Sequence, residues 1–169
     1  RIIRAKMNVG LFKDPMQQSL ETVEEKVGSN SYRQLAAQLV EKSLVLVKNE
    51  NSVLPLKKGL KIYVTGPASN KSGIYCGGWT GQWLGILEVD GGSTILDGLK
   101  EIADEYEFTI ITDKNKASEA DVTILCIGEK TYAEWYGDTE DLSITGALGL
   151  EGNIEAIQEA KELGKPVIT

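Results

Sequence analysis

The chain has 169 residues, with 18 lysines and arginines against 25 aspartates and glutamates, and it contains no histidine. Its length fits one ordinary domain, and its net charge of −7 argues against a nucleic-acid partner, which requires a basic face. Without histidine the chain supplies no histidine-activated nucleophile, no HExxH zinc site and no imidazole base, so any proton transfer falls to carboxylates. The two cysteines form no CxxC pair, no metal or cofactor is indicated, and no apolar run reaches the roughly 18–20 residues of a membrane helix.

The first segments are predicted to be helical or polar. Apolar residues at positions 2, 3 and 7 predict a short helix that ends near Gly10, and residues 13–29 are predicted to be a linker. A second helix is expected to start near Ser31, because Leu35, Ala36, Leu39 and Val40 then share one face. The chain begins without a methionine and stops inside an apolar β-type run, so we expect it to be an internal piece of a longer protein.

From residue 44 onward, β-type runs alternate with helical patterns. Strands are predicted at residues 44–47, 60–65, 108–112, 122–127 and from 167 onward, and helices at 95–103 and 153–163. Ser93 or Thr94 is available to cap the first of these helices. The alternation predicts an α/β fold with a mostly parallel sheet flanked by helices, in three layers and truncated at its C-terminal end.

The loop over residues 66–92 is rich in glycine and tryptophan and follows a predicted strand. Ligands of such sheets bind beyond the carboxyl ends of the strands. Trp79 and Trp83 are either hydrophobic plugs or a flat surface for the apolar faces of sugars. Residues 66–72 resemble a phosphate-binding loop only superficially, because the glycine before the lysine is missing and Pro67 removes a backbone donor. Nucleotide binding is therefore disfavoured.

The second loop with candidate functional residues follows the strand predicted at 122–127 and contains Glu134. It is either a solvated acidic turn or the position of a proton donor. Tyr132, Trp135 and Tyr136 surround this glutamate in sequence and could exclude water from it. Loss of water raises a carboxyl pKa, which keeps the proton on an acid near neutral pH.

Five segments give the chain a specific resemblance to glycoside hydrolase family 3, the β-glucosidase and β-glucan exohydrolase family, and within it to the plant cell-wall exoglucanase branch. They occur in order over almost the whole chain and are residues 1–6 with 10–12, 42–49 with 54–56, 76–80 with Trp83, 94–96, and Gly128-Glu129 with Tyr132, Glu134 and Gly137-Asp138.

The resemblance implies a domain organisation. Residues 1–12 would be the last helix of an upstream (β/α)8-type barrel, 13–29 the linker, and 30–169 most of an α/β sandwich domain. The whole enzyme would hydrolyse terminal β-D-glucosyl residues with retention, using an aspartate nucleophile on the barrel. The present chain would then be inactive without that barrel. Its partners would be the barrel and a β-glucoside or β-glucan oligosaccharide, with neither nucleic acid nor membrane involved.

The resemblance also implies residue roles. Glu134 matches the general acid/base, while Trp79 and Trp83 match substrate-binding residues at the entrance, with Trp83 the better candidate for stacking on a sugar. Glu129 and Asp138 match motif positions and are assigned loop support. Because the branch is often exported, an extracellular or periplasmic location is favoured over a cytoplasmic one. The alternative is a non-catalytic carbohydrate-binding or scaffold domain.

Overall fold

A computed structural model describes residues 1–16 and 20–169, and its internal contacts divide the chain into two units, Arg1–Glu50 and Asn51–Thr169. The first unit contains three helices, α1 (Ile2–Asn8), α2 (Leu20–Lys26) and α3 (Asn30–Ser43), of which α1 and α3 lie where the apolar spacing predicted helices. Helix α2 lies inside the predicted linker, whose residues 17–19 fall outside the described part of the chain. The assignment of residues 1–12 and 13–29 to a barrel helix and a linker stays a prediction.

The prediction of a strand at residues 44–47 is wrong. After α3 the chain is extended but irregular, and the four apolar side chains there are 63–91% exposed. Their β-type character expresses a preference for a pleated, half-buried surface, and a strand forms only when a neighbouring strand supplies its hydrogen-bond partners. No strand of the described chain pairs with this segment.

The second unit is built on a parallel four-stranded sheet. Its strands are β1 (Lys61–Thr65), β2 (Thr109–Ile111), β3 (Val122–Leu125) and β4 (Val167–Ile168), in the spatial order β2-β1-β3-β4. All three pairings are parallel, and β1 is central, with Ile62 opposite Ile110 on one side and Val122 on the other. The four strands predicted for this part of the sequence are confirmed, and so is the α/β fold.

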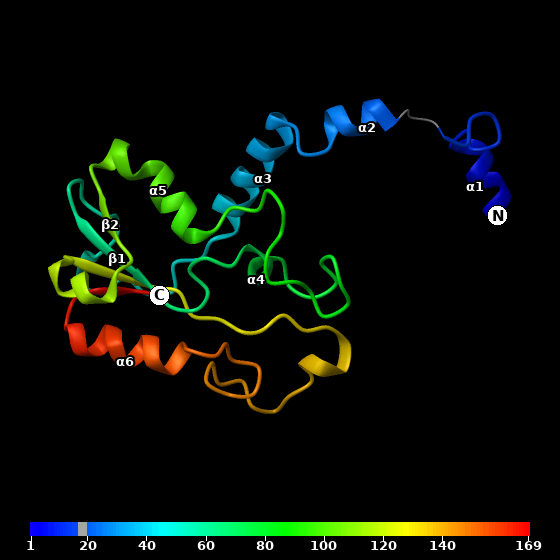
Figure 1. Cartoon of the computed structure of the whole chain (residues 1–169). Coiled ribbons are helices and arrows are strands. Elements are labelled where there is room, and N and C mark those ends of the chain that lie inside the picture. Colours follow the sequence, from blue (N-terminus) through cyan, green and yellow to red (C-terminus); the bar gives the residue numbers. More distant parts are fainter. Residues whose placement is uncertain (17–19) are drawn as a thin grey trace. The chain divides into compact units, whose positions relative to one another are not determined.

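Alternate residues of the strands face two different helical layers. Ile62 and Val64 are buried on one face together with Leu96 of helix α5 (Ile95–Tyr106). On the other face, Leu125 packs with Ala156 and Ala160 of helix α6 (Asn153–Leu163). Figure 1 shows α5 and α6 on opposite sides of the sheet, so the unit has three layers. Burial of a side chain such as Ile62 contributes about 1.5–3 kcal/mol, and such contacts hold the strand ends in place.

Helix α5 begins where its capping residues predicted. The Thr94 hydroxyl accepts a hydrogen bond from the Asp97 backbone N–H, and the Asp97 carboxylate accepts one from the Thr94 backbone N–H. This reciprocal pair satisfies two donors at the helix start. The hydrogen bonds from the side chain and backbone of Thr94 lower the pKa of Asp97.

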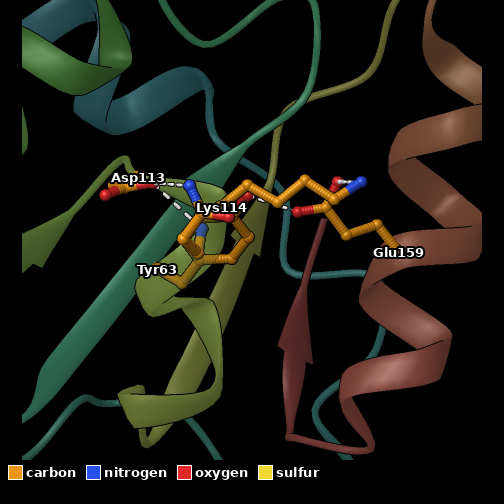
Figure 2. A network of polar contacts seen from close by, with 5 residues as sticks. Tyr63, Asp113, Lys114 and Glu159 are labelled. Atoms are coloured by element: carbon orange, nitrogen blue, oxygen red, sulfur yellow. Dashed lines mark hydrogen bonds and ion pairs between the residues drawn. The ribbon is translucent and has the colours of Figure 1, made fainter.

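A polar network lies on the α6 face of the sheet (Figure 2). Tyr63 of β1 is 2% exposed, and its hydroxyl donates a hydrogen bond to Oε1 of Glu159 on α6. The other carboxylate oxygen of Glu159 lies 3.0 Å from Nζ of Lys114, in a 3-10 helix over Lys114–Glu119. Burial, followed by the hydrogen bond to Glu159, raises the pKa of Tyr63. The network therefore joins β1, α6 and this 3-10 helix.

Among residues 1–16 and 20–169, none of the helices combines the length and apolar character required to cross a lipid bilayer.

Candidate active site

The candidate site lies where the strand order reverses, because β1 leads to β2 on one side and β3 leads to β4 on the other. Strands β1 and β3 are neighbours, but the chain leaves β1 towards α5 on one face and leaves β3 towards α6 on the other. In open α/β sheets, ligands bind outside the carboxyl ends of the strands at such a reversal. The two loops are the segment 66–94 after β1 (the tryptophan loop) and the segment 126–152 after β3 (the acid loop).

Glycines allow the two loops to touch through their backbones. A β-carbon at Gly66 would lie 2.1 Å from the carbonyl oxygen of Cys126, and one at Gly78 would lie 2.0 Å from that of Tyr132. Gly66 also has a φ of +101°, which other residues rarely adopt. The tryptophan loop therefore lies directly on the acid loop, and any side chain at these two positions would push the loops apart.

Three aromatic rings join the loops at the surface. The centroid of Trp83 lies 5.6 Å from that of Trp135 and 5.4 Å from that of Tyr136, both in edge-on geometry. Trp135 and Tyr136 are 6.2 Å apart with an angle of 30° between their planes. Such pairs contribute about 0.5–1.5 kcal/mol each beyond burial. Trp83, at 38% exposure, is therefore held by the acid loop while part of its surface stays accessible.

Trp79 is more open than Trp83. Its side chain is 66% exposed, and its backbone N–H donates a 2.9 Å hydrogen bond to the carbonyl of Trp83, which closes the turn between them. The two predicted substrate-binding residues are therefore linked, although only Trp83 contacts the acid loop through ring pairs among the described residues.

Glu134 begins a 3-10 turn, η3 (Glu134–Gly137), and its side chain is exposed. Of the two interpretations of this loop, water exclusion by Tyr132, Trp135 and Tyr136 is not observed within the present chain. The three rings are themselves 39%, 63% and 53% exposed, and the last two turn towards Trp83. The rings that follow Glu134 in sequence therefore pack against Trp83 and do not shield the glutamate from water.

Two predicted site residues carry an unusual backbone conformation. Trp79 has a φ of 64° and Glu134 a φ of 52°, in the left-handed region that bulky residues rarely occupy. Three other described non-glycine residues share this property, Asn51, Ser52 and Glu107. Left-handed backbone of this kind costs about 1–3 kcal/mol per residue and persists only where the surroundings enforce it, as binding and catalytic sites often do.

Asn153, which the sequence patterns did not single out, holds the acid loop together. This residue is 1% exposed at the start of α6. Its Nδ2 donates to the carbonyls of Gly128 (2.8 Å) and Ile144 (2.7 Å), and its Oδ1 accepts a 3.3 Å hydrogen bond from the Gly128 N–H. A polar residue at a helix start is typical of a cap, so its sequence position gave no sign of contacts with loop residues 25 and 9 positions away.

A cavity of about 400 Å³ lies at the start of α6 and includes Lys130, Glu151 and Glu155 in its lining. The predicted residues Trp79, Trp83 and Glu134 do not line it. No three acidic or cysteine side chains in the described part of the chain lie close enough together to bind a metal ion. The candidate site is therefore the exposed meeting point of the two loops, not this cavity.

Comparisons with known proteins agree on one family. The family model described as "Glycosyl hydrolase family 3 C-terminal domain" matches residues 44–169. The lysosomal beta glucosidase of Dictyostelium discoideum is 29% identical over 99% of this chain and 23% of its own length. A beta-xylosidase of Formosa agariphila is 31% identical over 99% of this chain and 25% of its own length. Periplasmic beta-glucosidases are related too, such as that of Salmonella typhimurium, which is 24% identical over 99% of this chain and 26% of its own length.

A solved structure of a beta-glucanase is similar over almost the whole chain. The exo-1,3/1,4-beta-glucanase of a Pseudoalteromonas species superposes with a TM-score of 0.82 at 31% identity, over 98% of this chain and 21% of that one. The present chain thus spans about a quarter of the length of the proteins that it matches.

Proposed function

Because the chain belongs to glycoside hydrolase family 3 and carries the family's C-terminal domain, we propose that it is the second domain of a retaining β-glucosidase or β-glucan exohydrolase. In this proposal it supplies a proton donor and an aromatic surface for sugar, and an upstream barrel supplies the attacking carboxylate. The observation that carries the proposal is the meeting of the two loops at the carboxyl ends of β1 and β3, with Glu134 beside the ring group of Trp83, Trp135 and Tyr136.

Glu134 is the proposed general acid/base. Retaining glycosidases place two carboxyl groups about 5–5.5 Å apart, one to attack the sugar and one to protonate the departing oxygen. Glu134 would provide the proton and later remove one from the attacking water, and an aspartate on the barrel would form the covalent intermediate. Since Glu134 is exposed in the present chain, the barrel and the bound sugar must supply the cover that excludes water. The chain alone is then inactive.

Trp79 and Trp83 are the proposed sugar-binding residues. The edge-on contacts of Trp83 with Trp135 and Tyr136 fix the orientation of its indole, so that less side-chain freedom is lost when a sugar stacks on it. Trp79, which is 66% exposed, would extend the same surface. The proposed substrates are β-glucosides and β-glucan oligosaccharides with a terminal β-D-glucosyl residue. An extracellular or periplasmic location of the protein is proposed with this function, since periplasmic β-glucosidases are among the relatives.

The test is Glu134→Gln in the full-length protein, with kcat/KM measured for an alkyl glucoside and for a dinitrophenyl glucoside. Loss of a positioned acid lowers rates by about 10²–10⁴-fold, and the alkyl substrate should show this loss because its leaving group needs the proton. The dinitrophenyl substrate should lose far less. Glu140→Gln, an exposed carboxylate of the same loop, is the matched control and should leave both rates unchanged.

Equal losses for the two substrates, or no loss for either, would remove Glu134 from the acid role. Retained sugar binding with no loss of hydrolysis would instead favour a non-catalytic carbohydrate-binding domain.

A further inference from the structure

A tyrosine ring supports the turn that carries Glu134. The ring of Tyr132 packs against Gly137, the last residue of that turn, so closely that a β-carbon at Gly137 would lie 2.5 Å from Cδ2 of the tyrosine. The Tyr132 hydroxyl donates a 3.0 Å hydrogen bond to Oε2 of Glu129. The hydrogen bond to Glu129 and the charge of that residue raise the pKa of Tyr132. The far end of the turn therefore lies against a ring whose hydroxyl is tied to Glu129.

Glu129 is itself on a fixed part of the backbone. It forms an antiparallel β-bridge with Gly149. On one side of it the carbonyl of Gly128 accepts a 3.0 Å hydrogen bond from Leu150, and on the other the Lys130 N–H donates a 2.7 Å hydrogen bond to the carbonyl of Leu148. The backbone at Glu129 is therefore held by hydrogen bonds, and Tyr132 connects it to the exposed turn that begins at Glu134.

We propose that Glu129 and Tyr132 are positioning residues for Glu134. Glu134 has a φ of 52°, a conformation that persists only where neighbouring groups enforce it. The hydrogen bond holds the Tyr132 ring against Gly137, and the ring keeps the turn closed, which fixes the direction in which the Glu134 carboxyl group leaves the backbone. The inference rests on the proposed function of Glu134 as the acid. It assigns neither Glu129 nor Tyr132 a proton-transfer step.

The experiment compares Tyr132→Phe, Glu129→Ala and Glu129→Gln in the full-length protein, with the alkyl and dinitrophenyl glucosides. Tyr132→Phe keeps the ring and removes the hydrogen bond, so kcat/KM for the alkyl glucoside should fall about three- to tenfold, the range that one hydrogen bond corresponds to. The dinitrophenyl glucoside should change less than twofold, since it hardly needs the acid. Glu129→Ala should match Tyr132→Phe, and Glu129→Gln should stay close to the parent because its amide oxygen still accepts the bond.

Two further variants separate positioning from general damage. Tyr106→Phe makes the same change at a tyrosine of α5 that is 37% exposed, against 39% for Tyr132, and should leave both substrates unaffected. The double variant Tyr132→Phe/Glu129→Ala should be no slower than either single variant, because both remove the same interaction.

Equal losses for both substrates, no loss for the alkyl glucoside, or additive losses in the double variant would overturn the inference. Glu134→Gln is measured alongside. If it shows the expected dependence on leaving group and Tyr132→Phe does not, the positioning role fails and the proposed function stands. If Glu134→Gln lacks that dependence, the proposed function fails and this inference falls with it.

Discussion

Asn153 offers the sharpest test of how the acid loop is held. Asn153→Ala removes three hydrogen bonds, of which the two donated by Nδ2 are short, at 2.7 and 2.8 Å, and the one accepted by Oδ1 is long, at 3.3 Å. A typical hydrogen bond contributes about 0.5–1.5 kcal/mol net, and a buried partner left unpaired costs more. The partner residues Gly128 and Ile144 are only half-buried, so water can hydrogen-bond to some of the backbone groups that lose the Asn153 side chain. We therefore expect a loss of about 2–3 kcal/mol.

Such a loss is a large fraction of the roughly 5–15 kcal/mol that stabilises a domain. Urea unfolding of the chain, followed by circular dichroism, measures it directly. Asn115→Ala is the matched control, because Asn115 is an exposed asparagine bonded to Asp113, and it should change the free energy of unfolding by less than about 0.5 kcal/mol. If Asn153→Ala is no more destabilising than this control, the three hydrogen bonds do not hold the loop and our reasoning is refuted.

Asn153→Asp refines the test. A carboxylate keeps the acceptor for the Gly128 N–H but has no hydrogen to donate, so it would face the carbonyl oxygens of Gly128 and Ile144 in a buried position. We expect this variant to be less stable than Asn153→Ala at neutral pH and to regain stability in acid, where the protonated carboxyl group can again donate. Equal stability of the Asp variant at both pH values would contradict the assigned orientation of the amide.

Two further predictions concern β1 and the tryptophan loop. The pKa of Tyr63 is raised above 10.0 in the folded chain, so the phenol ionises first in the unfolded chain. The free energy of unfolding should therefore fall as the pH rises from about 10 through the folded-state pKa. Urea unfolding from about pH 8 to 11 should show this additional pH dependence in the parent and not in Tyr63→Phe, and an equal pH dependence in both would be evidence against the raised pKa. In the full-length protein, Trp83→Ala should weaken inhibition by a disaccharide by about 0.5–1.5 kcal/mol more than inhibition by glucose, because only the disaccharide reaches the stacking surface. An unchanged ratio of the two inhibition constants would exclude Trp83 from that surface.

Elements with local signals could be predicted from the sequence. The apolar stripe of α5 and its cap at Ser93 or Thr94 were both encoded in a few consecutive residues, and the structure confirms them with Thr94 as the cap. The carboxylate of Asp97, which completes the cap, was not predicted. The strand predicted at residues 44–47 had the composition of a strand without a partner in the sheet. Pairing is a property of two segments, so one segment's composition does not decide it.

The candidate site depended on contacts that local patterns do not specify. Glu134, Trp79 and Trp83 were candidates because they lie in loops that follow predicted strands. Their specific roles came from the family resemblance and stay proposals. The directions of the rings could not be predicted, because Trp135 turns to Trp83 across about fifty residues of sequence, a separation over which side-chain spacing carries no information. Asn153 was missed for the same reason.

The glycine contacts constrain how the shapes of the two loops can change. Gly66 and Gly78 let one loop rest on the other without any intervening side chain, so the shape of each loop is the template for its neighbour. A tryptophan loop transplanted from a related protein would face an acid loop whose backbone it does not fit, unless the acid loop were exchanged with it. Under the proposed function, a change of sugar preference therefore requires exchanging the two loops together, and natural variation in either loop should be accompanied by compensating variation in the other.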